Sequence, residues 1–388
     1  MPEAQIPDWI GEKFGPYRVL RRLGVGGMAE TFEAVRFGPG GFSQRVCLKL
    51  VLPFYRKDPD FVRLFEREAR LAAKLRHSNI VGIIDFGNVD GTPYMALELV
   101  DGVDLRALLD VQPAKRLSHD LIALMALDLA QGLAHAHNPA SVGGNTSEVR
   151  GIAHRDLSPS NVMLSIEGEV LLTDFGVAKA MDGTNRKQSD VKGKVPYMSP
   201  EQLRNEVVDG RADLFSLGVL LFEALVGQRP YDGGSDPATI FLILQGEHPP
   251  LQELAPEAPE GLCRVIESLI EPDRDNRPIS AAELVEQLDE LAPGPRVRRD
   301  LGQMVSALQK QSTDASEAGL LDSYRSMSDV FSGTLPAGLA DGEEGAPTTA
   351  GPQDSKRKGL QVTASALLAI AFVAIVLIGI ILFALRMV

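Results

Sequence analysis

Hydrophobic positions in the 388-residue chain recur with two different periods between residues 17 and 291. Three short segments near the start, residues 17–23, 30–35 and 46–49, carry β-branched and large apolar side chains between turn-forming residues, which predicts strands. Residues 60–76 have helical spacing instead and predict an amphipathic helix. Its apolar side is formed by Phe61, Leu64, Phe65, Ala69, Ala72 and Leu75. Short segments of both kinds, separated by glycine and proline, predict one α+β domain over residues 17–291.

The sequence changes in character after residue 291. Residues 292–361 are richer in Ser, Gly, Ala, Pro and Asp, which predicts a flexible tether. Two groups of apolar residues within it nevertheless follow helical spacing. They are Leu301, Met304, Val305 and Leu308 in the first group, and Leu320, Tyr324 and Met327 in the second. Such groups either form short helices that dock on the domain or on a partner, or are only transiently helical, and the sequence favours neither.

The last hydrophobic segment, Val362–Leu385, contains no charged residue. As a helix of about 24 residues it would be roughly 36 Å long, enough to cross a hydrocarbon core of about 30 Å. A buried core helix is the alternative, but its apolar run usually ends after about 10–14 residues. Because Lys356, Arg357 and Lys358 precede the segment, the positive-inside bias predicts a single-pass transmembrane helix in the cell (inner) membrane, with the domain in the cytoplasm.

Composition narrows the function further. The chain has 39 Lys and Arg residues against 52 Asp and Glu, and its net charge of −13 argues against a nucleic-acid partner. Only two cysteines are present, Cys47 and Cys263, far apart in the sequence. This excludes a disulfide scaffold or a cysteine zinc site and fits a reducing compartment. Residues 1–16 lack the apolar run of a secretory signal.

The first candidate for chemistry is a glycine cluster, Gly24-Val25-Gly26-Gly27-Met28-Ala29. Glycines let backbone N–H groups approach phosphates closely, although a glycine-rich turn is often only a hairpin. A dinucleotide-binding fold would need a helix next. Since residues 30–35 predict a strand, the cluster predicts a β-hairpin flap. Lys49 lies in the next strand and Glu68 at the margin of the helix. They are either two separate surface charges or the two members of a partly buried ion pair.

Two polar motifs follow, His154-Arg155-Asp156-Leu157-Ser158-Pro159-Ser160-Asn161 and Asp174-Phe175-Gly176. With them, residues 17–291 resemble the bacterial eukaryotic-like (Hanks-type) Ser/Thr protein kinases, because independent motifs occur in that family's order. The further matching segments are the flap, Lys49, Glu68, Ser199-Pro200-Glu201, Asp213–Gly218 and Arg277-Pro278. The resemblance implies the two-lobed protein kinase fold, with a small β-rich N-lobe and a large helical C-lobe, and ATP and Mg²⁺ as ligands.

The same resemblance implies catalytic roles for matching positions. Lys49 would bind the α- and β-phosphates of ATP and pair with Glu68, and Asp156 would orient the substrate hydroxyl and accept its proton. Asn161 and Asp174 would hold Mg²⁺, which prefers hard oxygen ligands. These assignments agree with what phosphoryl transfer requires: neutralised phosphates, a hydroxyl held in line and a base within reach.

Further positions would contact the nucleotide. Leu23, Thr31, Cys47 and Met163 match the residues that enclose adenine, and Glu98 and Val100 match the backbone pair that binds the adenine edge. The flap would cover the phosphates. Its residues in this role are Gly24, Val25, Gly26, Gly27, Met28, Ala29, Glu30 and Thr31. Structural roles are implied as well: Asp213 should anchor the catalytic loop, and Arg277 should pair with Glu201.

Four positions depart from the family pattern. Ala29 replaces the third glycine of the flap and Thr31 the usual valine, and both changes are mild. Ser158 stands where the family has a lysine near the γ-phosphate, and Lys194 stands where it has a threonine. Our hypothesis is that the cation and the hydroxyl have exchanged places, so that the ammonium of Lys194 reaches Asp156. The alternative is a solvated Lys194 and a lower catalytic rate.

Together these observations predict an ATP-dependent protein Ser/Thr kinase in membrane-tethered signalling. Ser/Thr specificity is expected because Pro159 and residues 193–201 resemble the Ser/Thr class. Thr184 and Ser189, which lie among basic residues, are the expected autophosphorylation sites, and the resemblance implies that a phosphate there would order the segment against Arg155. A homodimer could serve autophosphorylation in trans. The alternative from another class is a membrane-tethered pseudokinase that binds nucleotide or partners without turnover; a scaffold acting through the tether is a third reading.

Overall fold

The computed structural model describes residues 9–142, 151–175 and 194–311. Contacts divide the chain into two units, residues 1–325 and 326–388, and all described residues belong to the first. Within the described ranges no helix combines the length and the apolar character that crossing a membrane requires. The predicted span at residues 362–385 lies outside the described residues, as do Thr184 and Ser189.

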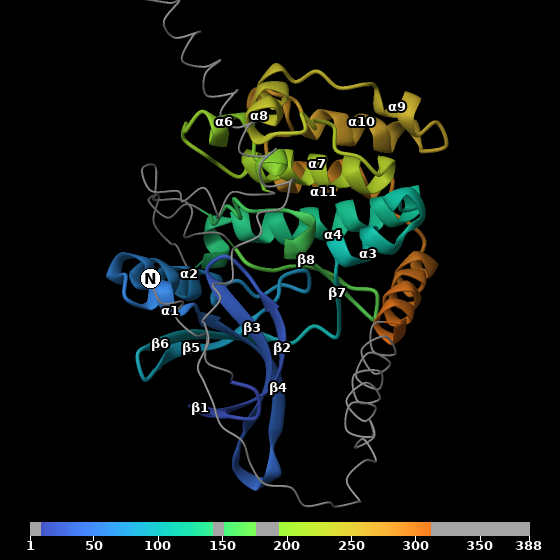
Figure 1. The fold of residues 1–388 in the computed structure, drawn as a ribbon. Coiled ribbons are helices and arrows are strands. Elements are labelled where there is room, and N and C mark those ends of the chain that lie inside the picture. Colours follow the sequence, from blue (N-terminus) through green and yellow to red (C-terminus); the bar gives the residue numbers. More distant parts are fainter. Residues whose placement is uncertain (1–8, 143–150, 176–193, 312–388) are drawn as a thin grey trace, which may run out of the picture. The chain divides into compact units, whose positions relative to one another are not determined.

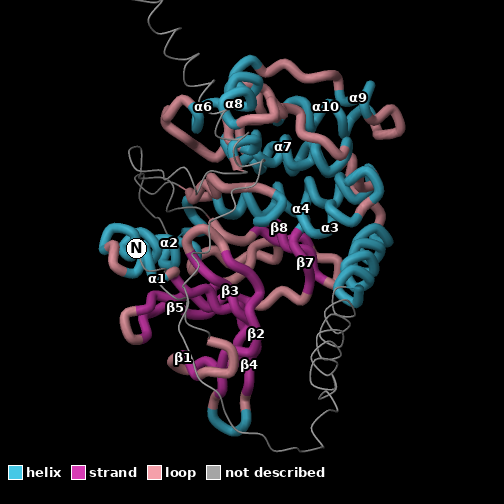
Figure 2. The backbone as a smooth tube through the Cα atoms, viewed as in Figure 1, coloured by secondary structure: helices cyan, strands magenta, loops and turns pink. Residues whose placement is uncertain are grey.

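The N-terminal part of the domain is one six-stranded antiparallel sheet (Figures 1 and 2) with strand order β1-β2-β3-β4-β6-β5. The strands are β1 (Lys13–Phe14), β2 (Tyr17–Val25), β3 (Ala29–Phe37), β4 (Ser43–Val51), β5 (Ile83–Val89) and β6 (Thr92–Glu98). The three strands predicted from the sequence are therefore present, each longer than its apolar core. Their neighbours in the sequence are also their neighbours in the sheet, except where β6 pairs with β4.

Alternation along β4 places its side chains on two different apolar clusters. Val46, Leu48 and Leu50 face a cluster that includes Phe14, Tyr17 and Phe32 of the three preceding strands. Cys47 and Val51 belong to a second cluster on the opposite face, together with residues of the following helix. Lys49 shares the parity of Cys47 and Val51, so the two-residue period of a strand turns its side chain toward that second face.

That helix, α2 (Pro59–Ala72), begins where its sequence provides a cap. The Asp58 carboxylate accepts hydrogen bonds from the amides of Asp60 and Phe61, and Pro59 occupies the first turn. Phe65 and Ala69 are buried against the sheet. The helix ends four residues before the predicted end at residue 76, because the amides of Lys74 and Leu75 bond to Leu71 and Ala72 in tight turns.

The C-terminal part is mainly helical and carries a three-stranded sheet, β7-β8-β9, on the side of the N-terminal sheet (Figure 1). These strands are β7 (Gly102–Asp104), β8 (Val162–Ser165) and β9 (Val170–Leu172). The helices are α3 (Leu105–Val111), α4 (His119–His137), α6 (Pro200–Leu203), α7 (Arg211–Val226), α8 (Asp236–Gln245), α9 (Leu251–Leu254), α10 (Glu260–Leu269) and α11 (Ala281–Asp289), with short helix α1 (Pro53–Arg56) beside the first sheet.

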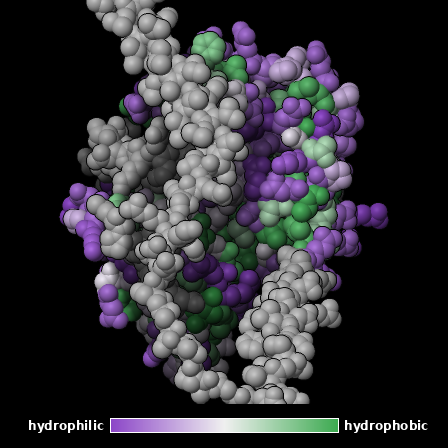
Figure 3. Space-filling view, in the orientation of Figure 1, coloured by the Kyte–Doolittle hydropathy of each residue, from purple (hydrophilic) through white to green (hydrophobic). Residues whose placement is uncertain are grey.

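Helix α7 is the centre of this helical part. All but the first of its residues are buried, and such a helix, apolar on every side, belongs inside a core rather than at a surface. Helix α4 packs beside it, and the two elements contact α10 and α11. On the face seen in Figure 3, hydrophilic side chains cover most of the outer helices, with small hydrophobic areas between them. The fold therefore has the two parts that the sequence predicted, one β-rich and one helical.

The prediction of a flexible tether from residue 292 is wrong for its first part. Residues 295–311 form a helix, drawn in orange in Figure 1, in which Leu301 and Val305 are fully buried in the core of the helical part. The Arg298 guanidinium binds both carboxylate oxygens of Asp128 in α4 at 2.9 Å. Of the two alternatives for this apolar group, docking on the domain is the one observed. The folded domain therefore extends beyond 291 to at least 311, and residues 312–361 lie outside the described ranges.

Candidate active site

The glycine cluster spans the end of β2, the turn at residues 26–28 and the first residue of β3, as predicted for a hairpin flap. The Gly26 amide donates to the Ala29 carbonyl at 2.8 Å, and the Thr31 hydroxyl donates to the Gly24 carbonyl at 3.3 Å. A methyl group built on Gly24 or Gly26 would meet no atom closer than 3.4 Å. The fold of the turn therefore does not require these glycines, which agrees with a surface kept bare for the approach of a ligand.

Beneath the flap, Lys49 forms an ion pair with Asp174. The Lys49 Nζ lies 2.7 Å from Asp174 Oδ1, and the two residues are 125 positions apart in the sequence. Burial alone would lower the pKa of Lys49, but the negative charges of Asp174 and Glu68 outweigh it and raise that pKa. Glu68, on α2, contributes to this pKa shift through its charge, and its predicted ion pair with Lys49 stays a prediction. The ammonium stays charged, ready to bind another anion.

Asp174 is held in an unusual backbone conformation. Its φ of +57° lies in the left-handed region, which costs a non-glycine residue roughly 1–3 kcal/mol and occurs mainly at functional sites. Phe175 beside it is buried, with its ring centroid 4.6 Å from that of His154. Burial would raise the pKa of Asp174, but the positive charges of Lys49 and Lys194 outweigh it and lower that pKa. Asp174 therefore carries a negative charge beside Lys49.

The catalytic loop is anchored from α7 by Asp213, as predicted. The Asp213 carboxylate accepts hydrogen bonds from the backbone amides of His154 and Arg155, each at 2.7 Å. His137 Nε2 lies 2.8 Å from the same carboxylate. Burial would raise the pKa of Asp213, but the hydrogen bond and charge of His137 outweigh this and lower it. The anchor holds Arg155 at a φ of +62° and so sets the direction of the next residue, Asp156.

Asp156 meets two other predicted site residues. Asn161 Nδ2 donates to the Asp156 carbonyl at 2.7 Å and to its carboxylate at 3.1 Å, and Lys194 Nζ donates to Asp156 Oδ2 at 2.5 Å. The Thr173 amide bonds to the Asn161 carbonyl at 3.0 Å, which links the catalytic loop to the segment that carries Asp174. The structure thus joins the loop, the Asp-Phe-Gly segment and Lys194 in one network.

The residues present fit Mg²⁺ by the chemistry of their donors. Asp174 offers a charged carboxylate, and Asn161, whose amide nitrogen is engaged with Asp156, presents its amide oxygen as the remaining acceptor. Both are hard oxygen ligands of the kind that Mg²⁺ prefers, supplemented in kinases by the phosphates of the nucleotide. The predicted metal role of this pair is consistent with the structure.

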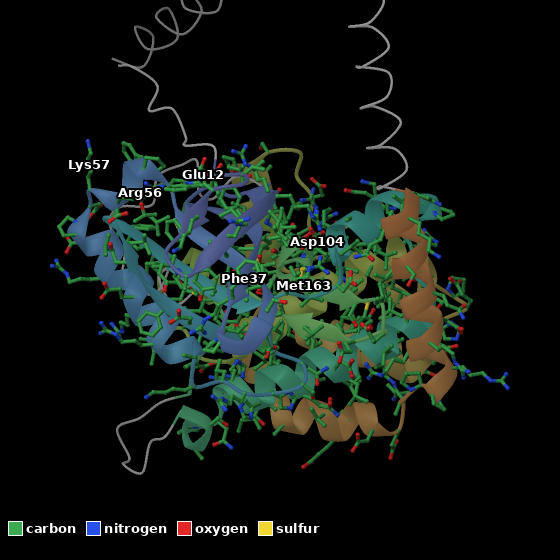
Figure 4. The ribbon with its side chains drawn as sticks, turned by 90° about the horizontal axis from the view of Figure 1, so that it is seen from below. Glu12, Phe37, Arg56, Lys57, Asp104 and Met163 are labelled. Atoms are coloured by element: carbon green, nitrogen blue, oxygen red, sulfur yellow. The ribbon has the colours of Figure 1, made fainter. Side chains whose placement is uncertain are left out.

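Several predicted adenine contacts gather on one apolar surface. Cys47, Val100 and Met163 pack partly buried against the same cluster between the sheet and β9. Burial, and next the charge of Asp174, raises the pKa of the Cys47 thiol to about 12, so it is neutral and apolar in character. Met163 pairs with Asp104 across β7 and β8, and the two residues lie together in Figure 4. This surface can form the floor of an adenine pocket.

On the side of the flap, the side chains expected near the nucleotide are more exposed to solvent. The Leu23 side chain is 40% exposed and Val25 is 56% exposed, both at the end of β2 where the flap begins. Two large apolar residues left in solvent next to a glycine turn are what a ligand would cover. Glu98, at the end of β6, exchanges two hydrogen bonds with Gly82 through its amide and its carboxylate. Its amide and its side chain are thus both engaged with Gly82, and the predicted backbone contact with adenine stays a prediction.

Two groups of charged and polar residues in the helical part support the site, of which the sequence predicted one. Arg277 binds Glu201 through two hydrogen bonds of 2.8 and 3.0 Å with both side chains buried, as predicted. The cluster of Arg106, Tyr197 and Glu223 was missed. Arg106 donates to the Tyr197 hydroxyl at 2.6 Å and to Glu223 at 3.1 Å, and Tyr197 also bonds Glu223. The three residues come from α3, the segment after Lys194, and α7, and no local pattern connects them.

A charged lysine and a charged aspartate meet under a glycine-rich hairpin, and a second aspartate faces them from an anchored loop. A site with these groups, built from a β-rich and a helical part, is that of a phosphotransferase of the protein kinase class. Comparison with known families agrees, since the family described as "Protein kinase domain" matches residues 17–288, more than half of the chain. This chain belongs to that family.

Individual relatives are bacterial kinases. Tyrosine-protein kinase MasK of Myxococcus xanthus (strain DK1622) is 42% identical over 258 residues, which are 66% of this chain and 40% of MasK. The probable serine/threonine-protein kinase PknB of Lactococcus lactis subsp. lactis (strain IL1403) is 34% identical over 279 residues, 71% of this chain and 42% of the relative. This chain therefore spans about two fifths of the length of these curated relatives.

Among solved structures, the kinase domain of Mycobacterium tuberculosis PknI superposes with a TM-score of 0.55 at 28% sequence identity. The match covers 73% of this chain and 98% of that one. The likeness thus extends over the complete kinase domain of the relative, both its β-rich part and its helical part.

Proposed function

We propose that this chain is an ATP-dependent protein kinase that phosphorylates serine and threonine residues of proteins, itself included, from a membrane-tethered position. One observation carries the catalytic part of the proposal. It is the ion pair of Lys49 with Asp174, together with the hydrogen bonds that Asn161 and Lys194 donate to Asp156, and it supports the roles proposed for these residues in phosphate binding, metal binding and proton transfer. These residues come from distant parts of the sequence, and their meeting at one site favours a shared catalytic role over separate structural roles.

The chemistry follows from the positions of these groups. The Lys49 ammonium neutralises charge on the nucleotide phosphates, and the flap closes over them. The oxygen of the substrate hydroxyl attacks the γ-phosphorus while Asp156 accepts the proton of that hydroxyl. ADP leaves with the electrons of the broken P–O bond. Mg²⁺, when held by Asn161 and Asp174, supplies further neutralisation of the phosphates. Positioning and electrostatics of this kind are the main contributions a protein makes to phosphoryl transfer.

Specificity for serine and threonine is the finer part of the proposal. It is supported by Pro159 in the catalytic loop, by residues 193–201, and by relatives such as PknB, PrkC and PknA, which are named serine/threonine-protein kinases. MasK, which is more similar in sequence than these, is named a tyrosine-protein kinase. Tyrosine phosphorylation is therefore the outcome that a test must be able to detect.

The test is incubation of the purified full chain with γ-labelled ATP and Mg²⁺, alone and with a generic basic protein. We expect labelled phosphoserine or phosphothreonine after acid hydrolysis, with Thr184 or Ser189 modified in the chain itself, and no label in Lys49→Met. Phosphotyrosine alone would contradict the proposed specificity. If nucleotide binds and no phosphate is incorporated, the chain is a pseudokinase and the proposed activity is wrong.

The membrane tether is proposed from the sequence, since residues 362–385 lie outside the described ranges. We predict that protease added to spheroplasts leaves residues 9–311 intact, because the charges at 356–358 keep the domain on the cytoplasmic side. Deleting residues 359–388 should release the protein into the soluble fraction with catalysis largely retained. The deletion leaves every described residue in place. Degradation of the domain by external protease, or membrane association of the deleted chain, would contradict the proposed topology.

A further inference from the structure

Lys194 places a positive charge directly on the proposed base. Its Nζ donates to Asp156 Oδ2 at 2.5 Å, and the side chains are 34% and 11% exposed, respectively. A lysine that served only solubility would extend into water, because ordering its long side chain costs conformational entropy. The charge of Lys194 also acts on Asp174, the partner of Lys49. The ammonium therefore belongs to the electrostatic environment of both Asp156 and Asp174.

The backbone that carries Lys194 is fixed by the residues after it. Val195 and Tyr197 are buried, and the Tyr197 amide bonds to the Lys194 carbonyl at 3.1 Å. The Tyr197 hydroxyl in turn contacts Arg106 of α3 and Glu223 of α7. The Ser216 hydroxyl holds the Tyr197 carbonyl at 2.7 Å. The position of Lys194 is thus determined by the helical part of the domain.

The catalytic loop itself supplies no cation at the neighbouring position. Ser158, two residues after Asp156, is only 5% exposed, and its carbonyl accepts the Asn161 amide at 2.9 Å. A lysine at this position would put an ammonium beside Asp156 from the loop. In this chain a small neutral side chain occupies that place, and the ammonium arrives from position 194.

We propose that Lys194 is the cation that accompanies phosphoryl transfer in this kinase. It would hold the Asp156 carboxylate toward the substrate hydroxyl and balance the charge that develops on the transferring phosphoryl group. The inference rests on the proposed function and adds a control point to it. Because the cation belongs to the segment 194–197 and not to the catalytic loop, seating of that segment through Tyr197 becomes a condition for catalysis.

This arrangement predicts a specific kinetic pattern. Lys194→Met keeps the length of the side chain and removes its charge, and should lower kcat by roughly 10²–10³-fold, the usual effect of removing one positioned charge from a transition state. The KM for ATP should change little, since the nucleotide is bound mainly by other groups. Lys194→Arg should retain more activity than Lys194→Met. Lys57→Met is the matched control and should leave kcat unchanged, because Lys57 is exposed and points away from the domain (Figure 4).

The exchange itself is tested by a double-mutant cycle in the full chain. Lys194→Thr should lower kcat about as much as Lys194→Met, and adding Ser158→Lys should recover at least tenfold, since residues that share one task are non-additive. Recovery would not follow from a merely structural role of Lys194. Either of two results would overturn the role of Lys194 and leave the proposed kinase function standing. One is a kcat of Lys194→Met within threefold of an active wild type, and the other is no recovery of kcat in the double variant. An inactive wild type would contradict the proposed function as well.

Discussion

Asp156→Asn is expected to lower kcat by roughly 10²–10⁴-fold, the range over which a positioned general base contributes. The replacement keeps the shape of the side chain but cannot accept the proton of the substrate hydroxyl. The hydrogen bond from Asn161 to the backbone carbonyl of residue 156 does not involve the carboxylate and should persist. Binding of ATP should also persist, because Lys49, Asp174 and the apolar floor are unchanged.

Steady-state kinetics and ATP titration of the same full-chain preparation measure both parts of this prediction. Asp90→Asn is a suitable control. Asp90 is exposed in the turn between β5 and β6 at a φ of +48°, a conformation that asparagine adopts readily. If Asp156→Asn kept more than about a tenth of the wild-type rate, a deficit below roughly 1.4 kcal/mol, Asp156 would not be the base. Loss of ATP binding would likewise show that the substitution had damaged more than proton transfer.

The parts of the site that were predictable from the sequence are those fixed by local periodicity and spacing. The strand period puts Lys49 on the same face as Cys47, and the turn between two strand-like segments gives the flap. Asp156 and Asn161 are five positions apart in one loop, so their contact is local. The hypothesis that position 194 supplies the cation missing at position 158 requires Lys194 to reach Asp156, and the structure shows that hydrogen bond.

What the sequence could not give are contacts made by residues with no local pattern. His137 looks like an ordinary residue at a helix end, yet it bonds the Asp213 carboxylate 76 positions away. Tyr197 and Glu223 are similarly joined only by the packing of α7 against the segment after Lys194. Such partners are chosen by the tertiary arrangement, because many acidic and basic residues of a chain with 23% charged residues would satisfy the same local rules.

The misplaced domain boundary has a related cause. Composition averaged over residues 292–361 is that of a linker, because most of the segment lacks large apolar residues. The spacing of Leu301 and Val305 is the same in a docked helix and in a free one. What decides between them is the surface that receives the helix, which here includes Asp128 of α4 and Gly168 in the turn between β8 and β9. That surface is more than 120 residues away in the sequence.

Docking of this helix is close enough to require glycine. A methyl group on Gly302 would lie 2.3 Å from the Ile166 carbonyl oxygen, well inside van der Waals contact. Gly168 has a φ of +82°, and a methyl group on it would lie only 1.8 Å from the Arg298 carbonyl oxygen. The Gln309 side chain completes the contact, donating to Asp101 and to the Gly102 carbonyl at 3.1 Å. The helix therefore contacts the connection between the two parts of the domain as well as its core.

Substitution of Gly302 should change the stability of the domain in opposite directions for a docked and for a free helix. In an exposed helix, Gly302→Ala would stabilise by about 1 kcal/mol, because alanine is the better helix former. We expect it to destabilise the domain instead, since overpacking against a backbone group costs about 1–3 kcal/mol and can displace the helix. Leu301→Ala should cost about 2–5 kcal/mol, as fully buried leucines do.

Gln303→Ala is the control for both variants, because Gln303 lies on the exposed side of the same helix. Urea unfolding followed by circular dichroism is the suitable measurement. Fluorescence would report mainly on the N-terminal sheet, where the single tryptophan, Trp9, packs against Phe14. A lower midpoint for Leu301→Ala and Gly302→Ala, with Gln303→Ala close to wild type, would show that this helix belongs to the folded domain, as the structure has it to at least residue 311. A Gly302→Ala midpoint at or above wild type would mean that the helix is not docked in solution, and the boundary would return to residue 291.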